Sequence, residues 1–413
     1  MESSHSRRVI VFVNAAHAID HMFMLIFPTA VLSMSAAFGR SYGELLALSV
    51  GGFVAFGAAS IPAGWLGDLW SRRNMLAVFF FGIGAAAILA GCSNSVAMLA
   101  VSLTLIGLFA AIYHPVGGAL LASHAAKLGR EIGFNGVWGN LGIAFAALIT
   151  AGLAQYFGWR AAFILPGAAA MLFGAAFLLL VPDAPAPVRA SARQQAAVPR
   201  RIAMRAFMVL AVATVTGGVV FNAATVSLPK LFDERLLGLT QSSLGVGALV
   251  CAVYIAGAVA QLIIGKLVDR FSLKAIFVPL SALQAPCLFI AAKAGDWGLI
   301  AGAAGLMFAI FGQVTVNDAM IVRYTAEAWR SRAYALRYFL SFSASACAVP
   351  LVAYLHEIGA ASGGGFVMLF QVLAVFGLGI FLSSLFFPHR PNEVQAADAA
   401  DAPGDASPRP ARA

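Results

Sequence analysis

The sequence predicts an all-α polytopic membrane protein whose twelve transmembrane helices form two similar halves of six. Composition, a series of long apolar segments and a repeated motif support this prediction. Of the 413 residues, 61% are hydrophobic and 10% are charged, and the mean hydropathy is +0.89. Soluble domains carry about 25% charged residues. Most of the chain lies in apolar runs, so no large soluble domain fits.

Twelve apolar segments account for the predicted spans, since crossing a bilayer takes roughly 20 apolar residues. They lie at residues 9–32, 43–66, 74–92, 95–121, 134–156, 160–181, 206–230, 242–266, 275–293, 297–322, 333–355 and 364–387. Two stretches rich in Pro and Ala differ in kind. They divide the chain into an N-terminal half (1–181), a cytoplasmic linker (182–205), a C-terminal half (206–387) and a disordered cytoplasmic tail (388–413).

The positive charges predict the orientation. If both termini lie inside, 21 of the 26 Lys and Arg residues fall in inner segments and 5 in outer ones. Cytoplasmic loops carry such an excess. We therefore expect both termini to be cytoplasmic in a plasma membrane, with a bacterial inner membrane as the best match. The net charge of +9 is then explained by the basic residues on the cytoplasmic side of the lipid bilayer, and it predicts no nucleic-acid partner.

A motif after the second segment recurs after the eighth. It reads GWLGDLWSRR from Gly64 and GKLVDRFSLK from Gly265, an offset of 201 residues that also maps Pro28 onto Pro229. Two matches at one offset predict a parallel repeat of two six-helix halves. The residues expected to act as a gating loop at the inner mouth are Gly64, Asp68, Arg72, Arg73, Gly265, Asp269 and Arg270.

A polar patch interrupts the first apolar segment. Asn14, His17 and His21 share one helical face, with Asp20 beside them. An ionised side chain at the centre of a span costs about 2.5–3.5 kcal/mol on insertion scales. We expect Asp20, with His17 or His21, to carry a coupling proton, because such a site can load and release a proton near neutral pH. The alternative is a hydrogen-bond cluster that only holds helices together.

The acidic residues narrow the choice further. Of the 17 acidic residues, Asp20 and Asp318 are those well inside predicted spans. Arg337 lies at a depth similar to Asp318, and an ion pair would satisfy both, since an unpaired buried charge is costly. This pair is expected to be structural or part of an inner gate.

A proline directs attention to the fourth segment. Pro115 has no amide N–H, which leaves a carbonyl near residue 111 without its helical donor. A kink there would open His114 toward the interior, although His114 could instead bond that carbonyl. The predicted lining of a substrate cavity comprises Asn14, Tyr113, His114, Asn140, Asn222, Thr225, Tyr254, Gln313 and Asn317, with Asn135 and Gln261 as further candidates.

With its repeated Gly, Asp and basic residues, the loop motif resembles the signature of the major facilitator superfamily of transporters. Trp159–Phe163 is also similar to a common pattern of that family. The sequence departs from the signature at Leu69, where the family often has a basic residue, and at Ser71, where it often has Gly. The resemblance implies the two-halved transporter fold, alternating access and a substrate site near the midplane between the halves.

A second resemblance is to drug exporters of the fosmidomycin-resistance type. It rests on Tyr113-His114-Pro115, on Gly129-Arg130 and on the GNLG stretch from Gly139 to Gly142. The Gly-Pro pair of the antiporter motif is absent, and Ala146-Ala147 stand about where it would lie. The resemblance implies drug export, whereas the missing pair argues against drug/proton antiport.

The predicted function is therefore proton-coupled export of a small organic or amphiphilic molecule. No G-x-x-x-x-G-K-[ST] pattern is present, and the cysteines have no metal-ligand spacing, so we expect no enzyme, no cofactor and no metal. The expected partners are a small-molecule substrate, protons and lipid, and the expected assembly is a monomer. Proton-coupled uptake of a small metabolite and a non-transporting receptor on the same fold stay open.

Overall fold

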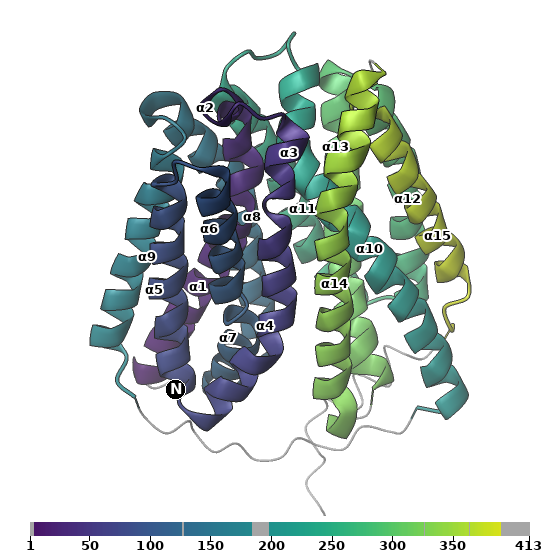
Figure 1. Ribbon diagram of the computed structural model, residues 1–413. Helices are drawn as coiled ribbons and strands as arrows, with labels where there is room; N and C mark the ends of the chain where they lie inside the picture. Colours follow the sequence, from purple (N-terminus) through teal and green to yellow (C-terminus); the bar gives the residue numbers. More distant parts are fainter. Residues whose placement is uncertain (1–3, 126–127, 184–197, 326, 363, 390–413) are drawn as a thin grey trace, which may run out of the picture.

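The computed structural model describes residues 4–125, 128–183, 198–325, 327–362 and 364–389 (Figure 1). Within these residues, twelve helical segments are long and apolar enough to cross a membrane, which confirms the predicted number of spans. Most of the predicted linker and nearly all of the predicted tail lie outside the described residues.

The first half contains six spans, several of which begin at a serine. The side chains of Ser41, Ser71 and Ser95 each accept a hydrogen bond from a backbone N–H of the following first turn. The elements of this half are α1 (Ser4–Ala30), η1 (Val31–Ser33), α2 (Ser35–Phe38), α3 (Tyr42–Ala47), α4 (Val50–Leu69), α5 (Arg72–Gly91), α6 (Val96–Ala110), α7 (Tyr113–His124), α8 (Leu128–Phe157) and α9 (Ala161–Leu180).

The second half consists of longer, less interrupted helices. They are α10 (Arg200–Arg235), α11 (Ser243–Val268), α12 (Leu273–Lys293), α13 (Asp296–Tyr324), α14 (Glu327–Ala361) and α15 (Val367–Leu385). The boundary predicted between linker and C-terminal half, at residue 206, was wrong by six residues. Helix α10 starts directly after Pro199, which needs no helical partner for an N–H, and its basic first turns were too polar to be read as part of a span.

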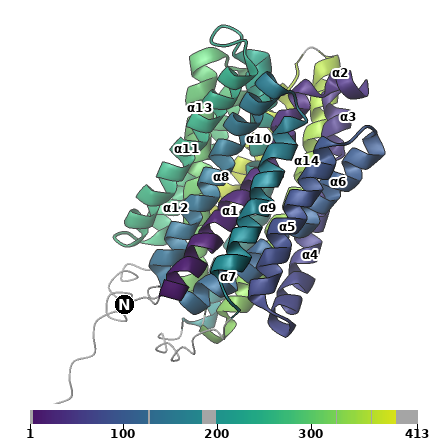
Figure 2. The ribbon, with the colours of Figure 1, turned by 90° about the vertical axis from the view of Figure 1, so that its left-hand side faces the viewer.

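The two ends of the bundle differ in what they carry. The N-terminal end of α1, the end of α9 and the start of α10 lie at the lower end in Figure 1, which we call the linker end. The short helices α2 and α3 lie at the opposite end, which we call the loop end. Figure 2 shows α1 running through the first half beside α8 and α9, and α1 also packs against α7.

The repeated motif has equivalent structural roles in the two halves. Arg73, at the start of α5, donates hydrogen bonds to the carbonyls of Leu178 and Val181 at the end of α9. Lys274, exactly one repeat later in the chain, donates to the carbonyl of Leu385 at the end of α15. In each half a basic residue therefore fastens the start of the third span to the end of the sixth, as a parallel repeat requires.

The halves meet along α8 with α11 and along α4 with α14. At the loop end, Ser41 Oγ and the Gly43 N–H donate to Glu357 Oε1 of α14 at 2.7 and 2.9 Å. Deeper in the bundle, the rings of Phe56 and Phe342 lie 4.5 Å apart across the same interface. The Phe342 ring also lies 5.6 Å from that of His114, which places the start of α7 at the boundary between the halves.

Candidate functional site

The polar patch of α1 lies at the middle of that helix. Asn14 and Asp20 are buried, and Asp20 has no exposed surface at all. His17 and His21 are half-buried on the same face. A wholly buried carboxyl in the middle of a span is costly unless a nearby group compensates it. The partners of this patch come from α7 and α8.

The break between α6 and α7 delivers the partner of Asp20. The fourth span is helical to Ala110, turns at Ala111 and Ile112, and resumes as α7 at Tyr113. Pro115 provides no N–H to the carbonyl of Ala111, and the next amide, that of Val116, bonds the carbonyl of Ile112. The kink predicted from Pro115 is thus present, and it places His114 beside α1.

His114 is the residue that faces Asp20. Its Nε2 lies 3.4 Å from Asp20 Oδ2. The sequence had paired Asp20 with His17 or His21, and in this respect the prediction was wrong. Those two histidines share a helix with Asp20, but His17 turns toward α8, where its Nδ1 lies 2.8 Å from the carbonyl oxygen of Asn135. The Asp20 partner is instead supplied by α7.

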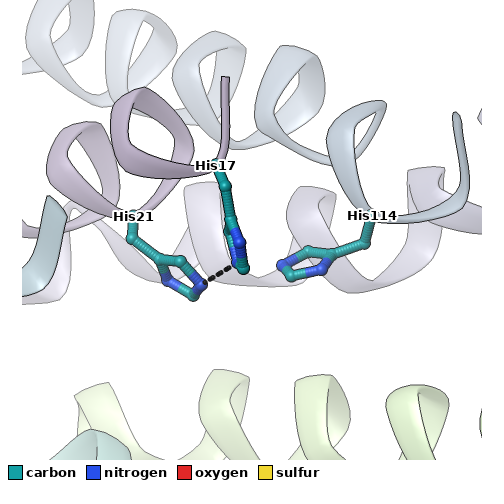
Figure 3. A group of neighbouring side chains, drawn as sticks. All are labelled: His17, His21 and His114. Carbon is teal, nitrogen blue, oxygen red and sulfur yellow. Dashed lines mark hydrogen bonds between the residues drawn. The ribbon is translucent and has the colours of Figure 1, made fainter. Parts of the chain in front are cut away.

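The three histidines nevertheless form one group (Figure 3). His21 Nε2 lies 3.1 Å from His17 Nε2, and one nitrogen from each of His17, His21 and His114 lies within 4.8 Å of the others. The sequence analysis predicted no metal, on the ground that the cysteines have no metal-ligand spacing, and it did not consider these three histidines together. The folded arrangement brings together three imidazoles that could act as ligands.

Asn135 of α8 connects the patch to its surroundings. Its side-chain Nδ2 donates to Asn14 Oδ1 at 2.9 Å, and its side-chain Oδ1 accepts from the Tyr113 hydroxyl at 3.0 Å. The Tyr113 ring stacks on His17, with centroids 4.8 Å apart. Asn14, Tyr113 and His114 of the predicted cavity therefore belong to one cluster of polar and ring contacts with His17, Asp20 and His21, although Asn135 had only a secondary place in the prediction.

The remaining predicted cavity residues lie apart from this cluster. Asn140 reaches across the halves and donates to Gln261 Oε1 of α11. Asn222 bonds Ser345, and Tyr254 donates to the Thr225 carbonyl, both within the second half. Gln313 accepts from Gln284, a wholly buried residue that the sequence analysis missed, and Asn317 is also buried. The contacts of Gln313 are those of helix packing, which amide side chains commonly provide between membrane helices.

The predicted gating loop is at the linker end. Asp68, in the last turn of α4, pairs with Arg72 at the start of α5 at 2.8 Å, and both side chains are exposed. Gly64 lies in α4 near Pro115, and Gly265 lies in α11. Asp269 and Arg270 follow the end of α11 and are exposed. The Asp–basic pair of the first half thus joins two helices of that same half.

Asp318 of α13 and Arg337 of α14 form the ion pair that their depth predicted. The Arg337 side chain is 11% exposed and that of Asp318 is 43% exposed. The pair joins two helices of the second half and lies away from the α1 patch. Its geometry is that of a helix-to-helix tie.

Comparison with known proteins identifies the family. The sequence profile of the Major Facilitator Superfamily matches residues 13–254 and 234–412. The chain belongs to this superfamily. It is therefore related to membrane transporters, and the fold prediction made from the loop motif is confirmed. The narrower resemblance to fosmidomycin-resistance exporters stays a prediction.

Two curated relatives come from Streptomyces. The chain is 30% identical over 185 residues to a probable actinorhodin transporter of Streptomyces coelicolor, covering 42% of this chain and 31% of the relative. It is 31% identical over 110 residues to the puromycin resistance protein pur8 of Streptomyces alboniger, covering 26% of this chain and 22% of the relative. The matches thus span less than a third of either relative.

Solved structures share the fold at low identity. A bacterial homologue of the human lysosomal transporter Spinster, inward-facing and occupied, gives a TM-score of 0.73 at 13% identity over 97% of this chain and 98% of that one. A D-xylose–proton symporter gives 0.72 at 15% identity over 95% and 99%. These likenesses show the fold.

Proposed function

We propose that the protein exports a small amphiphilic organic molecule by alternating access, driven by protons that Asp20 takes up and releases. Membership of the superfamily makes it a secondary transporter. The actinorhodin and puromycin relatives favour export of an aromatic compound of the antibiotic type. The residue ranges 1–181 and 206–387 act as the two halves that move about the central patch.

The observation that carries the proposal is the wholly buried Asp20 facing His114 in the middle of the first half. A structural tie between helices would favour a group that stays in one charge state, such as Arg337 with Asp318. A carboxyl beside an imidazole can exchange a proton with it. Proton relays in membrane proteins are built from such Asp and His residues.

The charge distribution supports an orientation of the protein in the membrane. The linker end carries most of the Lys and Arg residues, so we place this end and both termini in the cytoplasm. Aromatic rings surround His114, with Phe56 of α4 and Phe342 of α14 at centroid distances of 5.8 and 5.6 Å, and of these two Phe342 comes from the other half. Such surfaces suit a planar apolar substrate, which stacks on them. The transporter is expected to work as a monomer.

The test uses purified protein in vesicles with an imposed pH gradient and a chelator present. Puromycin is the probe, and its gradient-driven movement is compared between the wild type and Asp20→Asn. We expect D20N to lose at least about tenfold of the driven flux, because Asn cannot carry the proton. His124→Gln is the matched control, since His124 is buried in the same helix as His114 and its ring bonds its own turn at Leu120.

Two results would argue against the proposal. Undiminished gradient-driven flux in D20N would remove Asp20 as the proton carrier. Puromycin flux that ignores the direction of the pH gradient in the wild type would remove proton coupling itself.

A further inference from the structure

The histidine group has the composition of a metal site. We propose that His17, His21 and His114 together bind one divalent transition-metal ion, of which Zn²⁺ is the prototype, in the middle of the first half. Neutral imidazole is a preferred ligand of Zn²⁺, Ni²⁺ and Cu²⁺. Three such ligands with a fourth position left to solvent are a common arrangement for zinc. This inference goes beyond the proposed function and does not depend on the exported substrate.

The distances fit a shared ion after a small adjustment. Two nitrogens bound to one tetrahedral zinc at 2.0–2.1 Å lie about 3.3 Å apart. His17 Nε2 and His21 Nε2 are already 3.1 Å apart. The widest separation within the group is 4.8 Å, so the third nitrogen needs to approach by up to about 1.5 Å. A rotation of the His114 side chain, which keeps 16% of its surface exposed, would provide a movement of this size.

The hydrogen bond of His17 prepares its nitrogen for a metal. A carbonyl oxygen can only accept, so His17 Nδ1 carries the hydrogen that it donates to Asn135. In neutral His17, Nε2 then presents its lone pair to the centre of the group, where His21 Nε2–H donates to it at 3.1 Å. The ion would replace this shared hydrogen, with the His21 proton moving to Nδ1. A backbone carbonyl that fixes the ligand tautomer in this way is typical of metal-bound histidine.

The neighbouring carboxylate supplies the charge that a dication needs. Asp20 is wholly buried, and its Oδ2 lies 3.4 Å from His114 Nε2. A carboxylate beside a ligating imidazole orients the ring and makes it a stronger ligand. Three neutral imidazoles alone would leave two positive charges in an apolar interior, which is costly. The ionised Asp20 offsets part of that charge from outside the ligand set.

Metal and proton compete for the same patch. A metal ion bound by His114 would fix this ring and hold it from exchanging a proton with Asp20, 3.4 Å away. Zn²⁺ is therefore expected to inhibit proton-driven export, with inhibition reversed by a chelator.

The experiment is a direct binding measurement on the full chain, purified through a tag without histidine. Zn²⁺ binding is followed by calorimetry, and Co²⁺ serves as a probe because its visible spectrum reports coordination geometry. We expect one Zn²⁺ per wild-type chain and at least about 100-fold weaker binding for His17→Ala, His21→Ala and His114→Ala, since even outer partners are worth 10–100-fold. Asp20→Asn is expected to weaken binding about tenfold while leaving the Co²⁺ spectrum unchanged in type.

His124→Gln is the matched control, because this histidine lies on α7 outside the group, with its ring 5.6 Å from that of His5. Its binding should equal that of the wild type. If a histidine-to-alanine variant unfolds, as its melting temperature would show, Zn²⁺ binding is measured on the more conservative variant His21→Asn in its place. Less than one equivalent of Zn²⁺ in the wild type, or binding as tight as that of the wild type in all three group variants, would overturn the inference. Zinc binding without proton-driven puromycin flux would instead count against the proposed function alone.

Discussion

Asp20, His114 and Asn135 show how single side chains from three helices define the site. Asp20 and His17 lie three residues apart in the sequence, yet Asp20 faces His114 of α7, whereas His17 bonds Asn135 of α8. The hydrophobic pattern predicted which face of α1 is polar. It did not predict which neighbour each side chain meets, because that depends on how α7 and α8 pack around α1.

The ion pair of Asp318 and Arg337 gives a prediction at the same scale. Asp318→Asn and Arg337→Met should each lower the melting temperature in detergent, because each leaves the other partner without this contact. In the double variant we expect a coupling energy of about 1 kcal/mol, kept small because Asp318 is 43% exposed and therefore screened. Additive effects of the two substitutions would show that the pair contributes no stability.

Individual helices were predicted well where hydrophobic length decides them and less well at their ends. The fourth span was drawn as one segment over 95–121, and the structure divides it into α6 and α7. Pro115 indicated this division, because the sequence alone shows that a proline has no N–H to donate. The start of α10 at Arg200 could not be predicted from the sequence. Arg200, Arg201 and Arg205 are charged like the linker before them, although the structure places all three in the helix.

The packing of α1 on α8 gives a prediction for a pair of glycines. A Cβ at Gly142 would collide with the Ala18 carbonyl oxygen of α1, whereas a Cβ at Gly133, in the same helix, would meet nothing within 4 Å. Gly142→Ala should therefore destabilise the protein by about 1–3 kcal/mol, the usual cost of overpacking. Because Gly133→Ala only removes freedom from the unfolded chain, it should be neutral or stabilise by up to about 1 kcal/mol.

Thermal melting of the two variants checks this difference. G142A should also weaken puromycin flux, because a displaced α1 carries His17 and Asp20 with it. Equal melting temperatures for G142A and G133A would show that α1 and α8 can separate without cost.

For the whole molecule, the repeat was the most informative feature of the sequence. The offset of 201 residues predicted two equivalent halves, and Arg73 and Lys274 make equivalent contacts in them. The offset could not predict how the halves meet, since interface residues such as Glu357 and Gln155 have no motif. Contacts between halves also change during alternating access, so a fixed pattern in the sequence is not expected for them.

The contact between the two halves at the loop end gives a prediction for the whole molecule. Glu357 of α14 accepts hydrogen bonds from Ser41 Oγ and the Gly43 N–H of the other half. Below this contact, Thr29 is buried in a small hollow between the halves, together with Pro229 and Tyr254. Glu357→Ala removes both bonds and should favour opening at this end. If their net worth is about 1 kcal/mol, the open population rises roughly fivefold.

The measurement is the rate at which a membrane-impermeant maleimide, applied from the loop end, labels the cysteine of T29C in a chain whose native cysteines are replaced by serine. We expect E357A to raise this rate roughly fivefold, in line with the population shift. Arg40→Ala is the matched control, because Arg40 lies at the same end but pairs with Glu44 of its own half at 3.0 Å. Breaking that exposed pair should leave the rate unchanged, since it does not join the halves. Equal rates for E357A and the wild type would mean that the two hydrogen bonds of Glu357 do not hold the loop end closed.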